Sequence, residues 1–390
     1  AVGCCGDFGM LRPGTESQSP RNPRRERRLW HDSERYAPSL GCHGCPEKEF
    51  CGGLSIRQSM FSCLDFCCGT PEQCDVVCRN HRDFALRVRE VDGFDLHTVP
   101  RTTPLLSPGL PLVIPMVFHR TSRAGPFISP ATALSLYQLF HRRTGHLRYN
   151  SRDELLEKFG LAPNTRLVLT GTDQDPPIEG WWKLSEERRP IIRKVRDLGI
   201  GLATTPNYSL FIDQPRWDDL HAMKRIGLVH EEFQSEGLPT ALHVNARTEL
   251  DVQRWTEYLG NRPEITQIAY EFATGTGWAG RQEVHAQWLA GMARAVGRPL
   301  HLIVRGGIDV LPVLADAFTR VSVVETSIFM KTMKRRRAVV DNRGALKWEP
   351  ALTPAGALLD ALLEENYATV ERWLRTLATS STIERRVAFG

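Results

Sequence analysis

The sequence predicts an α/β protein, a TIM-like parallel (β/α) barrel with a cysteine-rich metal module in front of it. From residue 96 onward, short runs rich in Val, Ile and Leu alternate with helical stretches, which is typical of βαβ units and a parallel sheet. Eight cysteines crowd between residues 42 and 78, and none follows. A doubly wound open sheet is the alternative. A nucleotide-binding open sheet carries a glycine-rich phosphate loop after one of its strands, and no such loop follows any predicted strand here.

The composition is that of an ordinary globular protein. A chain of 390 residues with 41% apolar residues can bury a full core. No stretch approaches the roughly 18 uncharged apolar residues of a membrane helix, and the arginine-rich N-terminus lacks the apolar core of a secretory signal. We therefore expect a cytoplasmic protein with no membrane partner. Thiols stay reduced there, which favours metal binding over disulfides for a dense cysteine cluster.

Shifts in composition divide the chain into four segments. Residues 1–41 are rich in Gly, Pro, Ser and Arg and predict a flexible basic arm. Residues 42–95 hold the cysteine module, residues 96–345 the barrel, and residues 346–390 a C-terminal helical extension. The sequence does not indicate an oligomeric state.

Seven apolar runs predict barrel strands. They occupy residues 112–118, 166–172, 200–205, 240–245, 265–272, 300–304 and 321–325. The eighth strand has two candidates, the run LHTVP at residues 96–100 and a segment after residue 337.

Helix start signals lie between these runs. Ser129 before Pro130 places a capping residue ahead of a proline at the first helical position, and residues 151–154 (SRDE) form a capping box. Further helices are expected at residues 185–198, 215–235, 249–259, 281–296, 308–319 and 354–377.

The cysteine module begins with CHGCPEKEFCGG at residues 42–53. Two thiolates separated by two residues can turn toward one metal or one cluster face, with further ligands arriving from a following loop. The paired glycines let the backbone pass close to a bulky inorganic core. The predicted metal ligands are Cys42, Cys45, Cys51, Cys63, Cys67, Cys68, Cys74 and Cys78.

The C-x2-C-x5-C-G-G spacing of residues 42–53 resembles the auxiliary iron–sulfur motif in the SPASM extension of radical S-adenosylmethionine enzymes. The resemblance implies iron–sulfur ligation by the first three cysteines. This chain departs from the family at Ser55, where the pattern has another cysteine, so the fourth ligand has to come from farther along. The radical motif C-x3-C-x2-C is missing, because Thr70 stands where its third cysteine would be.

An iron–sulfur cluster, of 4Fe–4S type and one or two in number, is the expected cofactor. Zinc, which accepts the same thiolates, is the alternative. Zinc modules usually show two C-x2-C pairs, whereas this module shows one.

Polar side chains end five of the predicted strands. Active sites of parallel barrels lie at the C-terminal ends of the strands, and alternate residues of a strand share one face. By this parity the second run places Leu167, Leu169, Gly171 and Asp173 on the same face, and the seventh pairs Val323 with Glu325. The predicted catalytic residues are Asp173, Glu271, His243, Glu325 and Asn245. They offer acid–base carboxylates, a proton shuttle and a hydrogen-bonding amide.

Cationic and loop residues near the same ends predict substrate binding. Six basic residues and one acid lie between Lys331 and Arg343, directly after the seventh run, which is where barrels commonly bind phosphate. The predicted substrate-binding residues are Asn207, Tyr208, Arg247, Arg305, Lys331, Lys334 and Arg335. The alternatives are an ordinary turn for the loop after residue 205, a structural ion pair between Arg305 and Glu325, and a solvated loop for the basic run.

Three functions remain open on the sequence. The first is an iron–sulfur barrel enzyme that modifies or exchanges a base, or cuts the backbone, in nucleic acid, because the basic run offers more charge than one phosphate needs. The second is a metabolic barrel enzyme acting on a small anionic substrate. The third is a non-catalytic redox-sensing or binding protein.

Overall fold

A computed structural model describes residues 87, 89–106, 108–141, 146–210, 216–273, 280–354 and 356–388. The basic arm and the module's eight cysteines lie outside these residues. The chain forms two compact units. One comprises Ala1–Pro100, Tyr208–Leu228 and Asn245–Tyr258, and the other comprises Arg101–Asn207, Val229–Val244 and Leu259–Gly390.

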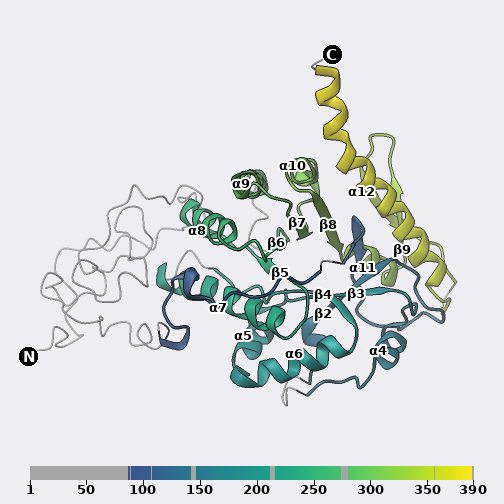
Figure 1. The fold of residues 1–390 in the computed structure, drawn as a ribbon. Helices are drawn as coiled ribbons and strands as arrows, with labels where there is room; N and C mark the ends of the chain where they lie inside the picture. Colours follow the sequence, from purple (N-terminus) through teal and green to yellow (C-terminus); the bar gives the residue numbers. More distant parts are fainter. Residues whose placement is uncertain are drawn as a thin grey trace, which may run out of the picture. The chain divides into compact units, whose positions relative to one another are not determined.

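The second unit contains the predicted (β/α)8 barrel (Figure 1). Its parallel strands follow the order β1-β8-β7-β6-β5-β4-β3-β2. The barrel closes through a bridge between Met116 and Ala133, where the Val117 amide donates to the Ala133 carbonyl at 3.0 Å. The strands are β1 (Val113–Pro115), β2 (Ala131–Ser135), β3 (Arg166–Thr170), β4 (Ile200–Thr204), β5 (Thr240–His243), β6 (Gln267–Glu271), β7 (His301–Arg305) and β8 (Arg320–Glu325).

The eighth strand is β2, which neither predicted candidate matches. Ser129 and Pro130 precede this strand rather than a helix, and the Ser129 hydroxyl bonds the Ala131 carbonyl at 3.1 Å. Residues 96–100 instead contain a short 3-10 helix, η5 (Leu96–Thr98). The segment after residue 337 is strand β9 (Arg336–Val340), which pairs antiparallel with β10 (Leu346–Pro350) outside the barrel.

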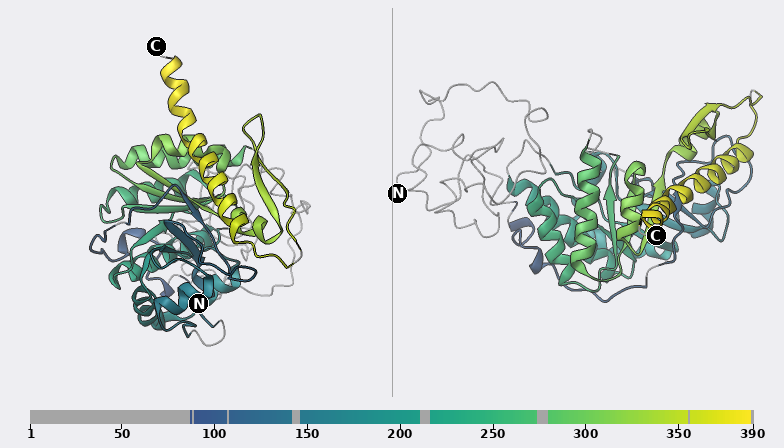
Figure 2. Two further views of the ribbon diagram at one scale, coloured as in Figure 1. Left: turned by 90° about the vertical axis from the view of Figure 1, so that its right-hand side faces the viewer. Right: turned by 90° about the horizontal axis from the view of Figure 1, so that it is seen from above.

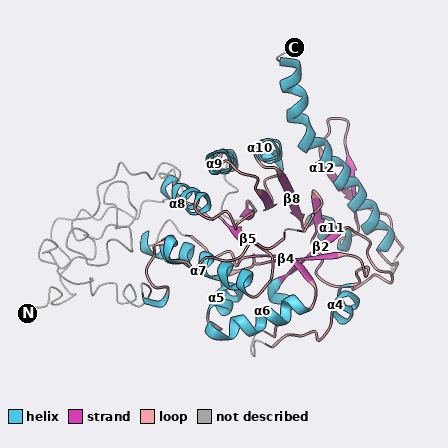
Figure 3. Ribbon diagram, in the orientation of Figure 1, coloured by secondary structure: helices cyan, strands magenta, loops and turns pink. Residues whose placement is uncertain are grey.

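Most predicted helices are present. The capping box starts α4, where the Ser151 hydroxyl accepts from the Glu154 amide at 3.2 Å. Helices α5 and α11 were not expected. The helices are α4 (Arg152–Phe159), α5 (Asp175–Trp182), α6 (Arg188–Asp197), α7 (Arg216–Ser235), α8 (Glu249–Gly260), α9 (Arg281–Val296), α10 (Leu311–Ala317), α11 (Ser327–Met333) and α12 (Asp360–Ala388). Among them α5, α6, α9 and α10 lie outside the strands (Figure 3). No helix in the described ranges is long and apolar enough to cross a membrane.

Small and branched side chains fill the barrel interior. Each strand contributes at least one residue to a single apolar cluster, because alternate residues of a strand point inward. The cluster comprises Leu110, Ile114, Met116, Ala131, Ala133, Val168, Leu202, Ala241, Ala269, Ile303 and Val324. The next inward-facing residue of each strand, two positions closer to the C-terminal end of the strand, therefore lies at the C-terminal mouth of the barrel.

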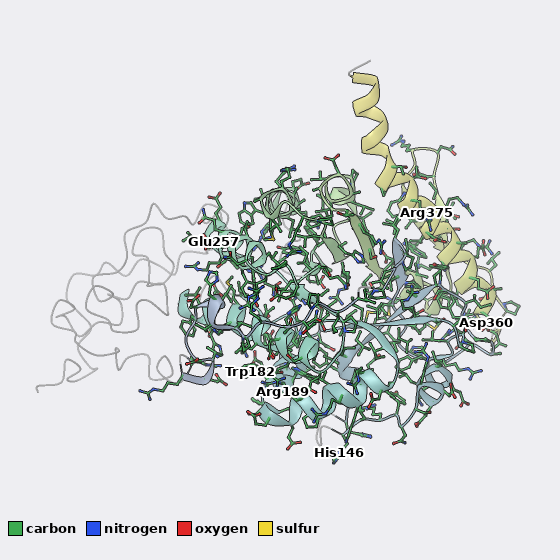
Figure 4. The ribbon with its side chains drawn as sticks, in the orientation of Figure 1. His146, Trp182, Arg189, Glu257, Asp360 and Arg375 are labelled. Carbon is green, nitrogen blue, oxygen red and sulfur yellow. The ribbon has the colours of Figure 1, made fainter. Side chains whose placement is uncertain are left out.

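Ion pairs fasten α6 to the end of α7 within the same unit. Arg188 bonds Glu232 through Nε and Nη2 at 2.8 and 2.7 Å, and its guanidinium lies 4.5 Å from the Trp182 ring. Arg189 pairs with Glu231 at 2.7 Å. Figure 4 labels Trp182 and Arg189, which come from α5 and α6. Two neighbouring arginines of α6 thus each hold a carboxylate of α7.

The C-terminal hairpin and α12 pack beside the barrel (Figure 2). Buried Asn366 of α12 joins three segments, because it accepts from the Ala338 amide at 2.7 Å and donates to the Thr332 hydroxyl and the Arg336 carbonyl at 2.8 and 2.9 Å. The predicted boundary between residues 345 and 346 falls in the turn between β9 and β10.

Candidate active site

Four side chains from four strand ends meet at the C-terminal mouth of the barrel. They are Thr172, His243, Glu271 and Arg305, which follow or end β3, β5, β6 and β7. His243, Glu271 and Arg305 lie two residues after the interior residues Ala241, Ala269 and Ile303, so they share the inward face. The structure therefore brings together three of the predicted site residues and adds Thr172.

Glu271 and Arg305 form an ion pair on neighbouring strands. Arg305 Nε lies 2.7 Å from Glu271 Oε2, and the Ala273 amide donates to Glu271 Oε1 at 2.8 Å. The Glu271 side chain is only 2% exposed, whereas that of Arg305 is 22% exposed. Burial raises the pKa of Glu271, and the Arg305 charge opposes the rise. Arg305 therefore pairs with Glu271, and its predicted alternative pairing with Glu325 is wrong.

Two glycines hold the ends of β6 and β7 close together. Gly306 and Gly307 have positive φ values of 76° and 69°, which glycine adopts readily. A Cβ atom at Gly306 would lie 2.8 Å from the Ala273 nitrogen, the same nitrogen that donates to Glu271. The turn after Arg305 thus supports the backbone that orients the carboxylate.

His243 is buried and held as one neutral tautomer. Its Nδ1 lies 2.5 Å from the Thr205 carbonyl oxygen, which can only accept, so Nδ1 carries the proton. The His243 amide donates to the Thr205 hydroxyl at 2.9 Å. Burial, helped by the Arg305 charge and opposed by the hydrogen bond to the Thr205 carbonyl, lowers the pKa of His243 to about 4. The unprotonated Nε2 faces the Thr172 hydroxyl at 3.5 Å.

The strand end before Thr172 depends on Gly171. A Cβ atom there would lie 2.3 Å from the Thr205 carbonyl oxygen. The Gly171 amide donates to the Thr204 hydroxyl at 2.9 Å, and its carbonyl accepts from the Tyr137 hydroxyl at 3.0 Å. The close approach of β3 to β4 therefore sets the position of the carbonyl that binds His243.

The predicted parity fails in β3 and β8. Val168 and Val324 lie in the interior cluster, so Asp173 and Glu325 do not share the inward face. Asp173 is exposed and accepts from the Gln174 amide at 2.8 Å. Glu325 accepts from the Ser327 amide at 2.6 Å, at the start of α11. The Glu325 contact is therefore local to its own loop, whereas Asp173 also accepts from the Ser135 hydroxyl, at the end of β2, at 3.4 Å.

Asn245, Tyr208 and Arg247 belong to the other compact unit. There the Asn245 amide group donates to the Tyr208 carbonyl at 2.9 Å, and Arg247 Nε donates to the Leu210 carbonyl at 2.8 Å. These contacts support the main chain of residues 208–210. Asn207 lies in the barrel unit, where its backbone N–H donates to the Gly171 carbonyl at 3.0 Å.

The basic run is not a solvated loop. Arg335, with a φ of 52°, donates to the Thr353 hydroxyl at 2.5 Å and the Ala357 carbonyl at 3.2 Å. Arg337 pairs with Glu365 at 3.1 Å. Lys331 and Lys334 lie in and just after α11, so a helix separates most of the run from β8.

No group of three or more His, Cys, Asp or Glu side chains placed to hold a metal occurs among the described residues. The predicted metal site therefore stands on the cysteine pattern of residues 42–78, which lies outside them.

Comparisons with known proteins add no family to this picture. The sequence matches no protein-family model and no curated protein.

Proposed function

We propose that this protein is a barrel enzyme that acts on nucleic acid, with Glu271 as its acid–base group and an iron–sulfur cluster in its cysteine module. The reaction would modify or exchange a base, or cut the backbone. The observation that carries the proposal is the buried Glu271 carboxylate beside the partly exposed Arg305 guanidinium at the barrel mouth. Barrel enzymes carry their catalytic residues at this end of the strands.

Burial and pairing suit Glu271 to proton transfer. A general acid or base works best when its pKa lies near the working pH, and burial raises the pKa of this carboxyl. Arg305 and the Ala273 amide orient it from two sides. Because Arg305 also reaches solvent, its remaining N–H donors can bind a phosphate or carboxylate of the substrate.

The cations of the basic run support a polyanionic substrate, because Lys334 is exposed and Lys331 is half-buried. The structure records no hydrogen bond or ion pair between the Lys331 or Lys334 side chain and the described residues, and Arg336 is exposed. The sequence adds the arginines of the N-terminal arm. Clustered cations raise the local concentration of a nucleic acid and speed its association.

The cysteine donor set supports the cluster. Thiolates are the usual ligands of iron–sulfur clusters, and the spacing of Cys42, Cys45 and Cys51 resembles the SPASM auxiliary motif. Such a cluster would supply a structural or substrate-positioning centre. Anaerobically purified protein should be brown and contain iron and sulfide, whereas a colourless protein with stoichiometric zinc would overturn this part of the proposal.

Nucleoside mass spectrometry tests the reaction. DNA and RNA from cells that express the chain are digested and compared with nucleic acid from cells expressing Glu271→Gln. We expect an altered nucleoside, or new strand ends, that depends on Glu271. Glu364→Gln, an exposed carboxylate of α12, is the matched control and should behave as the wild type. Identical products from wild type and Glu271→Gln would favour a non-catalytic binding protein.

Salt-dependent binding tests the substrate class. Affinity for a short labelled oligonucleotide should fall as salt rises, and replacing Lys331 or Lys334 by Ala should each reduce the slope of log affinity against log salt by about 0.7–0.9. Absence of binding at low salt would rule out nucleic acid as the substrate. The second candidate, a small anionic substrate held by Arg305, would then be favoured.

A further inference from the structure

The β9–β10 hairpin is fastened to α12 near its start and at its turn. Asn366 of α12 accepts from the Ala338 amide and donates to the Arg336 carbonyl, both on β9. Trp373 of α12 donates through Nε1 to the Gly344 carbonyl, in the turn between the two strands, at 2.9 Å. The hairpin is therefore fixed in position relative to α12.

The register of the hairpin assigns its side chains to two faces. Residues directly opposite each other on paired strands share a face, and so do alternate residues of one strand. Trp348 lies opposite Ala338. The Trp348 face therefore carries Arg336, Ala338, Val340, Leu346, Trp348 and Pro350, and the second face carries Arg337, Val339, Lys347 and Glu349.

The two faces differ in charge. Both basic residues of the second face pair with a carboxylate, and the pairs are Lys347–Asp341 at 2.8 Å and Arg337–Glu365 at 3.1 Å. On the Trp348 face, Arg336 is exposed, and its Nη1 donates to the Trp348 carbonyl, a neutral group, at 3.2 Å. No carboxylate among the described residues pairs with Arg336. The Trp348 face therefore carries an uncompensated positive charge.

The Trp348 face is also apolar and partly open to solvent. Val340 is 41% exposed, Pro350 is exposed, and Trp348 and Leu346 are half-buried. The residue directly opposite Trp348 is the small Ala338, and in the described part of the chain the indole makes no aromatic contact and no hydrogen bond. An accessible aromatic ring beside a cation suits a single-stranded nucleic acid, whose bases stack on the ring and whose phosphates bind the cation.

We propose that the Trp348 face binds single-stranded nucleic acid, with a base stacked on the Trp348 indole and a backbone phosphate held by Arg336. The proposal rests on the proposed function and deepens it, because it names a binding surface and the single-stranded form of the substrate. Bases in a duplex stack on one another, so a duplex offers none to the ring without unpairing. Lys334, which is exposed just before β9, adds a second cation near Arg336.

Equilibrium binding of a labelled single strand of about ten nucleotides to the full chain tests the proposal. Trp348→Ala should lower the affinity about 5- to 150-fold, and Trp348→Phe, which keeps an aromatic ring, should lower it less. An abasic strand of the same length and charge has no base to stack, so wild type and Trp348→Ala should bind it equally. A variant that fails to fold would instead lose its affinity for both strands.

Arg336→Ala and Lys347→Ala are a matched pair, because each removes one positive charge from the same hairpin but from opposite faces. Arg336→Ala should reduce the slope of log affinity against log salt by about 0.7. Lys347→Ala should leave the slope unchanged, because Asp341 already compensates the lysine charge. Equal reductions in the two variants would contradict the assignment of the phosphate to the Trp348 face.

Equal affinities of wild type and Trp348→Ala for the base-containing strand would overturn the proposal. So would self-association that Trp348→Ala abolishes, measured by light scattering, with an unchanged affinity for the strand, because the face would then bind a second copy of the chain. The nucleoside product that depends on Glu271 is a separate readout. Trp348-dependent binding without that product would keep the surface and refute the reaction, whereas the product without Trp348-dependent binding would do the reverse.

Discussion

Gly171→Ala is expected to destabilise the barrel although it adds a single methyl group. The new Cβ would lie 2.3 Å from the Thr205 carbonyl oxygen, 2.5 Å from the Thr205 carbonyl carbon and 2.6 Å from the Pro206 nitrogen. All three are backbone atoms, so no side-chain rotation relieves the contact. Ordinary van der Waals contact starts at 3.4 Å, and the ends of β3 and β4 must therefore separate by about 1 Å.

The magnitude follows from what that separation disturbs. Overpacking of this kind costs about 1–3 kcal/mol. Moving Thr205 also weakens its carbonyl bond from His243 Nδ1, and an unsatisfied buried donor costs about 1–3 kcal/mol more. We expect a loss of about 2–6 kcal/mol in the free energy of unfolding, or a fall in Tm of roughly 4–12 °C for a unit of this size.

Thermal unfolding by circular dichroism measures the effect. The control is Gly180→Ala in α5, where a Cβ atom has nothing within 4 Å. That change should stabilise the protein by up to about 1 kcal/mol, because alanine favours the helix. If Gly171→Ala unfolds at the wild-type temperature, the close approach of β3 to β4 is refuted, and with it the account of how His243 is held.

Three further predictions concern stability. Arg335→Ala should lower the free energy of unfolding by about 1–3 kcal/mol, because the oxygen partners of Arg335 lose a charged donor. Replacing the exposed Arg336 by Ala should lower it by less than about 0.5 kcal/mol. Equal losses of Tm in the two variants would contradict this difference. Arg188→Ala should lower the free energy of unfolding by about 3–5 kcal/mol, because it leaves Glu232 without its buried partner. Replacing both residues by leucine should lower the free energy of unfolding less. A double variant as unstable as the single one would rule out the explanation. Burial lowers the pKa of His301 from 6.5 to about 4 in the folded protein. Its contribution to stability is therefore fully present above pH 6.5 and lost as pH falls toward 4. Denaturant unfolding should show a smaller loss with acid for His301→Asn than for the wild type, and parallel curves would disprove the linkage.

The barrel could be predicted because seven of its strands are long apolar runs separated by helical patterns. The eighth, β2, escaped because its sequence ATALS is rich in helix-forming alanine and leucine and follows a Ser-Pro start signal. All five of its residues are buried. Burial between neighbouring strands, a tertiary effect, overrides this local preference.

The site was predictable where strand parity runs without interruption. His243, Glu271 and Arg305 follow interior residues at a spacing of two, as expected. In β3 the register with β4 shifts between Leu167 and Val168, and the exposed Asp173 suggested the wrong face. Thr172 gave no signal, because threonine is common in strands for its shape alone.

The role of Arg335 could not be read from charge. Four consecutive cations predict a positively charged surface. Arg335 instead has a φ of 52° and hydrogen-bonds Thr353 and Ala357, so it links the end of α11 to the chain before α12. Those partners lie 18 and 22 residues away in the sequence. Only the fold brings them together.

The closure of the barrel has a consequence for its biosynthesis. Val113 of β1 pairs with Val323 of β8, 210 residues later, and β1 meets β2 through the single bridge at Met116. At roughly 5–20 residues per second, a ribosome needs on the order of 10–40 s to make the intervening chain. During that time β1 is a strand without its main partner. Its three-residue length and its Pro115, which cannot donate to a ladder, make it a poor template for pairing with other nascent chains.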